Sequence, residues 1–383
     1  MANRMIWNQT AYFGAGAVAV IPQELKDRSF AKAFVVTDQQ LVEAGVTGQV
    51  LAWLDRASFP YELFTDIAPN PPTEDVAAGL TAFKASKADV LIAIGGGSPQ
   101  DTCKAIGILA ANPRFADVRS LEGTPGTPNP SVPIVAVPTT AGTASETTIN
   151  YVITDRQRAR KFVCVDPHAI PVLAVVDSAM MATAPPALKV ATGLDALTHA
   201  IEGYTTKGAW ELSDMFHLKA IQVIVRSLAK AVDGDAQAAQ DMALAQYVAG
   251  MGYSNVGLGI VHGMAHPLGG FYGAPHGVAN GILLAPVMAF NAEYTGEKYR
   301  DIAEAFGVED ARRGPLVDIR RAAVDAVARL TKDLGNPTTL REIGAKRQDL
   351  PALAGAAYAD VCTPGNPRPV VVQDLEGIYQ SVY

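Results

Sequence analysis

Short apolar runs alternate with helical stretches through the first half of the chain. Runs such as AFVVTD at 33–38 and ADVLIAI at 88–94 are rich in β-branched residues and apolar on both faces, as strands of a buried parallel sheet are. Three more runs share this character: PIVAVP at 133–138, FVCV at 162–165 and VLAVVD at 172–177. Stretches between them, such as TEDVAAGLTAFKAS at 73–86, have the apolar spacing of a helix. The alternation predicts a doubly wound α/β domain with a parallel sheet.

The pattern changes near Pro185. From Ala187 onward apolar residues recur at intervals of three and four, alanine-rich segments dominate and β-branched runs disappear. We therefore expect an α/β domain over residues 1–184 and a helical domain over residues 185–383. The proline-rich piece GTPGTPNPSVP at 123–133 is interpreted as a surface loop.

Composition and charge exclude several classes of partner. With 383 residues and 49% hydrophobic content, the chain can bury a large core in two or three domains. It has 31 basic and 38 acidic residues and no stripe of lysine and arginine, so nucleic acid and anionic membranes are poor candidates for partners. No segment approaches the roughly 20 apolar residues that span a bilayer, and the first ten residues lack a signal-peptide core. We expect a soluble, cytoplasmic protein.

The three cysteines, Cys103, Cys164 and Cys362, are odd in number, scattered and outside any pair motif. This usage suits free thiols in a reducing compartment. A role as a small buried hydrophobic side chain fits each of them better than a catalytic role.

Two glycine-rich segments compete for a phosphate-binding role. IGGGSPQDTCKAIGIL, from Ile94, follows a strong buried strand and opens a helix, with Ser98, Asp101 and Thr102 available to cap it. Glycine there lets the backbone approach a pyrophosphate, and the helix N-terminus supplies amide donors. GAGAVA at 14–19 matches a dinucleotide fingerprint, but the strand before it is poor in apolar residues, so a turn without a ligand explains it equally well.

Two further features lie at predicted strand ends. The turn PTTAGTASETT at 138–148 places Thr139, Thr140 and Thr143 where their hydroxyls can contact phosphate or ribose, although it can equally be a capped helix start. Asp38 closes the first predicted strand, at the sheet edge where open α/β folds bind ligands. Its carboxylate can accept from a ribose 2′-hydroxyl and repel a 2′-phosphate, which favours NAD over NADP. The alternative is an ordinary turn aspartate.

Histidines gather in the segment GLGIVHGMAHPLGGFYGAPHG. His262 and His266 are four apart, so they share a face if the segment is helical, and His276 follows a glycine-rich bend. Upstream, Asp195 and His199 are also four apart, in a segment with helical apolar spacing. Two helices that each offer a ligand pair, together with a loop histidine, are typical of a buried divalent metal site.

These five groups exceed the three or four protein ligands of a catalytic metal centre. Pro267 disfavours helical geometry at the residue before it, which would place His266 at a helix end, turned away from His262 and free for proton transfer. Spacing alone leaves His262 and His266 hard to separate. Other polar residues receive structural interpretations: surface or core for His168 and His217, and solvated or capping for Glu202 and Asp214, although Glu202 is near enough in sequence to reach the site.

Six segments spread along the chain carry a family resemblance: MANRMI, IGGGSPQDTCKAIGI, PTTAGTASETTINYVITD, RKFVCVDPH, TGLDALTHAIEGY and GLGIVHGMAHPLGGFY. Through them the chain resembles the iron-dependent, group III alcohol dehydrogenases over essentially its whole length. The resemblance implies an N-terminal dinucleotide-binding domain, here residues 1–184, and a helical metal and substrate domain, here residues 185–383.

The resemblance also implies roles for single residues. The metal ligands fall on Asp195, His199, His262 and His276, and the catalytic histidine on the nicotinamide side falls on His266. Cofactor contacts fall on Asp38, Asn70, Gly96, Gly97, Ser98, Thr139, Thr140, Thr143 and Lys161. The substrate pocket would include Asn150, Tyr253 and Cys362.

The implied activity is reversible hydride transfer between NADH and a small aldehyde, with lactaldehyde and 1,2-propanediol as the expected pair. One carboxylate and three imidazoles suit Fe(II) and also Zn(II), so the choice of iron rests on the resemblance. Ethanol, 1,3-propanediol and glycerol are alternative substrates, and a metal-dependent lyase or hydrolase on the same frame is a more remote alternative. The resemblance also suggests a homodimer.

Two positions depart from the family pattern. Ala144 stands where glycine is common, a small change that we expect to be harmless. Tyr253 stands where phenylalanine is expected, and its hydroxyl group puts the fine substrate preference in doubt.

Overall fold

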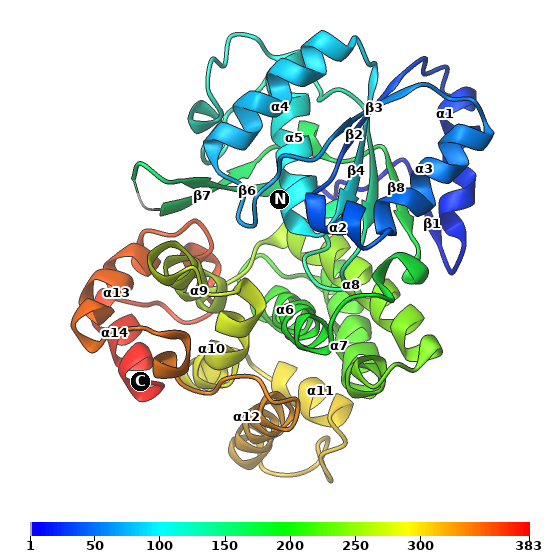
Figure 1. The fold of residues 1–383 in the computed structure, drawn as a ribbon. Coiled ribbons are helices and arrows are strands. Elements are labelled where there is room, and N and C mark those ends of the chain that lie inside the picture. The colour runs from blue at the N-terminus through cyan, green and yellow to red at the C-terminus, as the bar shows by residue number, and fades with distance from the viewer. Residues whose placement is uncertain (1, 159) are drawn as a thin grey trace. The chain divides into compact units, whose positions relative to one another are not determined.

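The chain forms two compact units, residues 1–184 and residues 185–383, in a computed structural model that describes residues 2–158 and 160–383 (Figure 1). The first unit combines strands and helices. The second is helical, and no strand occurs among its described residues. The predicted fold class, a parallel-sheet α/β domain followed by a helical domain, is confirmed.

Six parallel strands form the sheet of the first unit, in the order β1-β8-β5-β4-β2-β3. Their bounds are Thr10–Phe13 for β1, Ala33–Val36 for β2, Tyr61–Phe64 for β3, Val90–Gly95 for β4, Ile134–Pro138 for β5 and Leu173–Val176 for β8. Each of the four inner strands is buried along its whole length. The two edge strands are partly exposed and have no strong apolar run, which is why the hydrophobic pattern did not reveal them.

Helices cover both faces of this sheet. Phe34 and Val36 face α4 (Thr73–Ser86) and α5 (Gly97–Ala111), whereas Val35 faces α1 (Ile21–Asp27) and α3 (Val46–Arg56). Successive strand residues point to opposite faces, so a sheet covered on both sides needs apolar residues at every position. This requirement explains the continuous apolar runs in the sequence.

The predicted strand FVCV at 162–165 does not belong to the parallel sheet. It lies in β7 (Arg160–Val165), which pairs antiparallel with β6 (Asn150–Asp155) in a separate two-stranded sheet. Phe162 and Cys164 are buried against the main core, and this burial produced the apolar signal. The two strands are too close in sequence for the crossover helix that a parallel pair requires, so they form a hairpin.

The direction in which successive strands are added to the sheet reverses between β2 and β4. The chain leaves β2 for β3 on one side and returns to β4 on the other. Open α/β sheets bind their ligands at such a reversal, beyond the carboxyl ends of the strands. Asp38, with the short helix α2 (Gln39–Glu43), follows β2, and the turn at Gly95–Ser98 follows β4.

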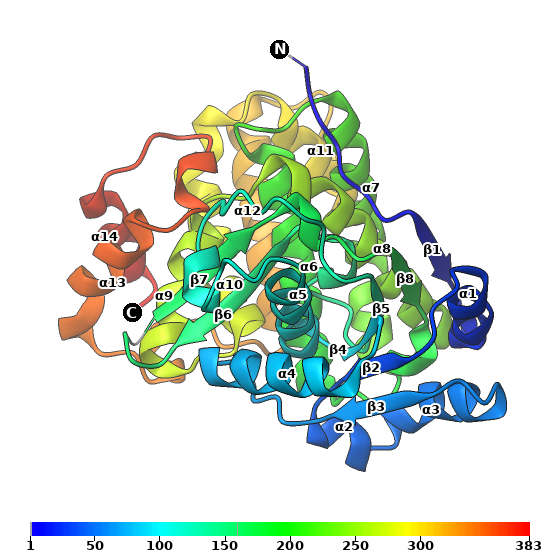
Figure 2. The same ribbon diagram turned by 90° about the horizontal axis from the view of Figure 1, so that it is seen from above.

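The second unit contains nine α-helices in its described residues. Their bounds are Pro186–Thr205 for α6, Glu211–Val232 for α7, Ala236–Val256 for α8, Ile260–Tyr272 for α9, His276–Asn291 for α10, Lys298–Ala305 for α11, Leu316–Asp333 for α12, Leu350–Tyr358 for α13 and Val372–Ser381 for α14. Helix α6 packs against α7, α8 and α10 and is buried along most of its length (Figure 2).

Among the described residues, no helix is long and apolar enough to cross a membrane. The segment at 123–133 forms no helix and is mostly exposed or partly exposed, in agreement with its interpretation as a surface loop. His217 has no exposed surface and is a core residue, whereas His168 is partly exposed.

Ala144 adopts a backbone conformation that L-residues avoid. Its φ is 54° and its ψ is 26°, in the left-handed region, and only 1% of the residue is exposed. The Cβ atom makes this conformation unfavourable by roughly 1–2 kcal/mol relative to glycine. Alanine in place of glycine therefore lowers the stability of the fold at this position, and the expectation that the change is harmless is wrong.

Ala144→Gly should raise the free energy of unfolding by roughly 0.5–1 kcal/mol, because relief of the left-handed strain exceeds the entropy that glycine adds to the unfolded chain. Urea unfolding followed by circular dichroism measures the change. Ala78→Gly, at an exposed position in the middle of α4, is the control and should lower the same free energy by roughly 1 kcal/mol. A loss of stability in Ala144→Gly would contradict the strain argument.

Candidate active site

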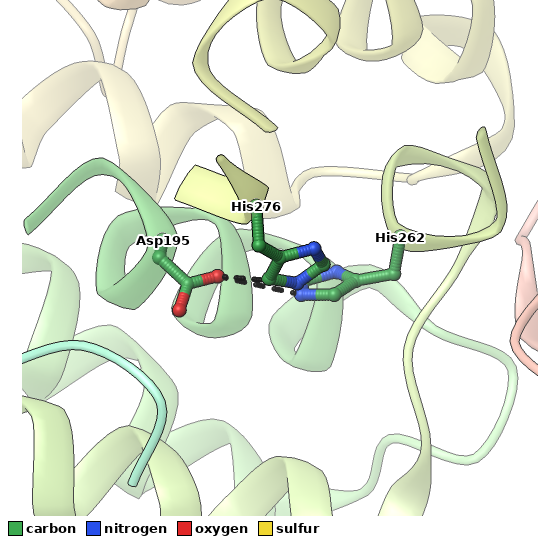
Figure 3. Close-up of side chains that lie close together, drawn as sticks. All are labelled: Asp195, His262 and His276. Atoms are coloured by element: carbon green, nitrogen blue, oxygen red, sulfur yellow. Dashed lines mark ion pairs between the residues drawn. The ribbon is translucent and has the colours of Figure 1, made fainter. Parts of the chain in front are cut away.

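Three helices of the second unit bring polar side chains to one buried point. Asp195 lies in the interior of α6, His262 in the first turn of α9, and His276 is the first residue of α10. The ligand atoms of these three side chains lie within 4.8 Å of one another. Figure 3 shows the carboxylate and the two imidazoles pointing toward one another.

The imidazole nitrogens converge on a single carboxylate oxygen. Asp195 Oδ1 is 3.8 Å from His262 Nε2, 3.6 Å from His276 Nε2 and 3.8 Å from His199 Nε2. Ligands bound at about 2.0–2.2 Å around one tetrahedral cation lie roughly 3.3–3.6 Å apart. The donor set and its spacing therefore fit a divalent cation, with a modest contraction on binding.

Because these side chains are buried, the pKa of each one depends strongly on the charges of its neighbours. Asp195 and His262 are each 2% exposed. Burial by itself would raise the pKa of Asp195, but His199, His276 and His262 outweigh it and hold the pKa below its usual range. Burial likewise opposes protonation of His262, yet hydrogen bonds to Asp195 and Glu202 raise its pKa to about 9. Positive charge is thus favoured at this point, and a divalent cation can supply it.

Glu202 orients His262 from behind. Its Oε2 accepts from His262 Nδ1 at 2.6 Å, which directs Nε2 toward Asp195, and its Oε1 accepts from the Val261 backbone N–H at 2.6 Å. A carboxylate behind a ligating imidazole fixes the tautomer and raises the basicity of the ligand. Of the two roles expected for Glu202, capping is correct and solvation is wrong, because the side chain is buried. Glu202 lies two helical turns after Asp195, and this spacing indicated in the sequence that both side chains lie on the same face of α6.

Glu202 thus reaches the site, as its spacing from Asp195 allowed, whereas Asn280 is a residue that the sequence analysis missed. It lies one turn after His276 on α10, is fully buried, and donates from Nδ2 to Asp195 Oδ1 at 2.8 Å. The same nitrogen is 3.4 Å from His262 Nε2 and 3.3 Å from His276 Nε2. The Asn280 amide thus contacts the donor atoms of all three helices.

The imidazole of His199 is enclosed by rings. It stacks on Tyr253 with ring centroids 4.1 Å apart and on His262 with centroids 4.5 Å apart. These contacts fix the plane of the ring while its Nε2 lies 3.8 Å from the Asp195 carboxylate. His199 therefore lies beside Asp195, but it is not among the three residues whose ligand atoms all lie within 4.8 Å of one another, and its role as a fourth ligand stays a prediction.

His266 lies beside this cluster but faces another partner. Its Nδ1 is 2.8 Å from Asp360 Oδ2, and its ring stacks on that of His276 with centroids 5.3 Å apart. The expected helix end at His266 is wrong, because α9 continues through Pro267 to Tyr272. A proline inside a helix costs about 3 kcal/mol, and burial of residues 260–269 outweighs that cost.

Several residues expected to contact the cofactor lie together in the first unit. Lys161 Nζ donates to Asn70 Oδ1 at 2.8 Å, and the Asn70 backbone N–H donates to Ser98 Oγ at 3.2 Å. A Cβ on Gly96 would lie 3.2 Å from Thr140 Oγ1, and one on Gly97 would lie 3.2 Å from Thr143 Cγ2. The glycine turn after β4 thus adjoins the hydroxyl-rich turn after β5.

The start of α5 has no side-chain cap. Asp101 accepts from Ser145 Oγ and from the Val152 N–H, Thr102 donates to the Ser98 carbonyl, and Ser98 accepts from Asn70. The expectation that Ser98, Asp101 or Thr102 caps this helix is therefore wrong. The chain turns sharply into the helix at Gly95, where φ is +156° and a Cβ would lie 2.4 Å from the Pro99 ring.

The other two candidates for cofactor binding already have partners. In the GAGAVA turn the Val18 N–H donates to the buried carboxylate of Asp177 at 3.2 Å, which favours the interpretation without a ligand. Asp38 caps α2 by accepting from the Leu41 N–H at 2.9 Å. That bond uses Oδ1, and the cap is compatible with a second contact through the other oxygen.

The described sequence matches two family domains. Residues 8–178 match iron-containing alcohol dehydrogenase, and residues 189–383 match the C-terminal domain of the Fe-containing alcohol dehydrogenase family. The chain belongs to the iron-containing alcohol dehydrogenase family. This confirms the family that the motifs indicated.

Relatives within the iron-containing alcohol dehydrogenases cover the whole chain. It is 58% identical to the lactaldehyde reductase of Escherichia coli (strain K12) over 383 residues, 100% of both chains. It is 40% identical to the NAD-dependent methanol dehydrogenase of Bacillus methanolicus, with 96% of each chain covered. It superposes on the crystal structure of 1,3-propanediol oxidoreductase with a TM-score of 0.96 and 38% identity, over 100% of both chains.

The residues expected to line the substrate pocket of this iron-containing alcohol dehydrogenase belong to different units. Asn150 begins β6 in the first unit, whereas Tyr253 and Cys362 belong to the second. Tyr253 is buried against His199, and Cys362 lies near His266 and Asp360. The three cysteines are free, and Cys103 and Cys164 are buried as expected, whereas Cys362 is partly exposed.

Substitution of the two α9 histidines should separate metal binding from turnover. His262→Ala should purify without metal, because it removes a donor at the point of convergence. His266→Ala should keep its metal and lose roughly 10²–10⁴-fold in turnover, the usual contribution of a proton-transfer group. Elemental analysis and steady-state kinetics measure the two effects. Metal-free His266→Ala protein would show that this division is wrong.

NADH binding should depend on the charge of Lys161. Burial lowers the pKa of Lys161 to about 8, with Asp101 opposing the shift. The cationic form therefore predominates below about pH 8, and the dissociation constant for NADH should rise roughly three- to tenfold between pH 7 and pH 9. Fluorescence titration measures this constant. The Lys161→Met variant should bind NADH more weakly, with a dissociation constant that does not change with pH. The Lys84→Met variant, at an exposed position, should show the same pH dependence as the wild type.

Proposed function

We propose that the protein is an NAD- and iron-dependent lactaldehyde reductase that transfers hydride reversibly between NADH and lactaldehyde, with 1,2-propanediol as the alcohol. The observation that carries the proposal is the convergence of Asp195, His262 and His276 in a chain that is 58% identical to a lactaldehyde reductase over its full length. The substrate assignment comes from that relative. The metal assignment comes from the family and the donor set.

Different residues of the chain have different roles in this reaction. Asp195, His199, His262 and His276 would hold a divalent cation, which would supply the Lewis-acid chemistry that a carbonyl group needs. The turn at Gly95–Ser98 and the threonines after β5 bind the NADH phosphates and ribose through backbone amides and hydroxyls. Hydride chemistry belongs to the cofactor, and these residues orient it.

Residues around the cation site would control orientation and proton movement. Glu202 holds His262 with Nε2 toward Asp195, so the ligand geometry exists before a cation binds. His266, beside His276, would exchange a proton with the substrate oxygen through a ribose hydroxyl or water. In the direction of aldehyde reduction, His266 delivers the proton that the alcohol product needs.

A different small diol or alcohol is the second candidate. The 1,3-propanediol oxidoreductase structure superposes closely, and the hydroxyl of Tyr253 adds a polar group that a hydroxyaldehyde of different length could use. A lyase would use NAD without net formation of NADH. A hydrolase would not need the glycine turn at Gly95–Ser98, to which NADH binding is assigned above.

We also propose a homodimer that works in the cytoplasm. The family resemblance supports the dimer, and the free cysteines suit a reducing compartment. Light scattering coupled to size-exclusion chromatography measures the assembly.

The deciding experiment is NADH oxidation by anaerobically prepared apoprotein given lactaldehyde, with Fe(II) and Zn(II) added to separate samples. We expect iron to restore turnover with one NADH consumed per aldehyde reduced, and zinc to restore little or none. His262→Ala apoprotein treated with iron is the control and should remain inactive.

Each other result has a distinct meaning. Protein that binds NADH but reduces no lactaldehyde with either metal would overturn the substrate, and 3-hydroxypropionaldehyde would be tested next. Turnover restored equally by zinc would overturn the requirement for iron. Failure to bind NADH would overturn the reaction class and favour a hydrolase.

A further inference from the structure

A second polar cluster lies next to the cation site, and its carboxylate, Asp360, has no part in the reaction as described above. It consists of His266, Asp360 and Cys362, whose ligand atoms lie within 4.8 Å of one another. His266 comes from α9, whereas Asp360 and Cys362 come from the loop that follows α13. His266 is buried, and Asp360 and Cys362 are partly buried.

The Asp360 carboxylate is fixed at both oxygens. Oδ1 accepts from the Cys362 backbone N–H at 2.8 Å, and Oδ2 lies 2.8 Å from His266 Nδ1. Burial would raise the pKa of Asp360, but His266 and the bonds from Cys362 hold it below its usual range, so the carboxylate is ionised. An ionised carboxylate can only accept, so the shared proton must reside on His266 Nδ1.

The backbone is shaped to bring this loop to α9. Thr363 Oγ1 donates to the Ala357 carbonyl at 2.6 Å, which closes the loop on itself. A Cβ on Gly263 would lie 2.5 Å from Thr363 Oγ1, so only glycine at this position lets the loop approach the helix. Gly263 directly follows the proposed ligand His262, and the close approach therefore occurs one residue from the cation site.

We propose that Asp360 is a positioning residue that holds His266 in the Nδ1–H tautomer, with Nε2 as the atom that exchanges protons. The proposal rests on the proposed function, in which His266 relays the proton. With the proton on Nδ1, the lone pair of Nε2 accepts a proton during alcohol oxidation. In aldehyde reduction Nε2–H donates it, and the Asp360 carboxylate stabilises the imidazolium between the two steps.

The direct test is the tautomer of His266 in protein loaded with diamagnetic Zn(II). Long-range proton–nitrogen spectra of protein carrying ¹⁵N-histidine distinguish a protonated from an unprotonated ring nitrogen, and the spectrum of His266→Ala assigns the signal. We expect Nδ1–H in the wild type, a shift toward Nε2–H in Asp360→Asn, and retention of Nδ1–H in Asp360→Glu.

Kinetics of the iron-loaded enzyme form the second readout. Asp360→Asn should lose roughly 10–100-fold in turnover with metal content and NADH affinity unchanged, and Asp360→Glu should recover part of the loss. The substitution should have no further effect in a His266→Ala background, because Asp360 acts through that ring. Asp349→Asn, which removes a carboxylate bonded to the Tyr272 hydroxyl, is the matched control and should retain wild-type turnover.

Three results would overturn the proposal: Nε2–H in the wild type, an unchanged tautomer in Asp360→Asn, or an equal loss of turnover with and without His266. If Asp360→Asn does not fold, the wild-type and Asp360→Glu spectra still decide the tautomer. Failure of the proposed function is a separate result, because an enzyme that reduces no aldehyde leaves the tautomer measurement intact.

Discussion

The buried carboxylate of Asp195 is the constraint on which the helical unit depends. An ion removed from water is strongly unfavourable unless opposite charge and hydrogen bonds surround it. Helices α6, α9 and α10 each bring a donor to the same point, so the packing of these helices and the charge balance of the site are inseparable. Glu202 adds a second carboxylate behind His262. Histidines must be neutral to bind a metal, and two carboxylates among neutral imidazoles suit a divalent cation better than a monovalent one.

The α/β unit meets a different requirement, which is to present backbone amides and hydroxyls at the carboxyl ends of its strands. The order of the strands reverses between β2 and β4, and open α/β sheets bind ligands beyond the carboxyl ends of the strands at such a reversal. The sharp turn at Gly95 begins α5 there without a side-chain cap. Lys161 donates a hydrogen bond to Asn70 beside this turn, so the ammonium group of Lys161 is held close to the amide donors of the backbone. Such an arrangement binds an anion through preformed groups, with little ordering required on binding.

Substrate preference is the least constrained part of the proposed function. Asn150, Tyr253 and Cys362, the residues expected to line the substrate pocket, come from distant parts of the chain, and a change in any one of them would alter the polarity around a small aldehyde. The hydroxyl of Tyr253 is such a change. A hydrophobic contact discriminates between small substrates by only about 1–3 kcal/mol, whereas an unpaired buried polar group discriminates far more strongly. One tyrosine can therefore shift the ranking of related diols.

The sequence by itself determined the fold class, the inner strands of the sheet and the gathering of the histidines, because burial on both faces and helical periodicity leave direct traces in residue order. Only the tertiary structure revealed the partner of His266, since Asp360 lies 94 residues away and no local pattern links them. It also placed FVCV in a hairpin, carried α9 through Pro267 and put Ala144 in a left-handed conformation. At Pro267 and at Ala144, packing between distant segments outweighed a local preference worth about 1–3 kcal/mol.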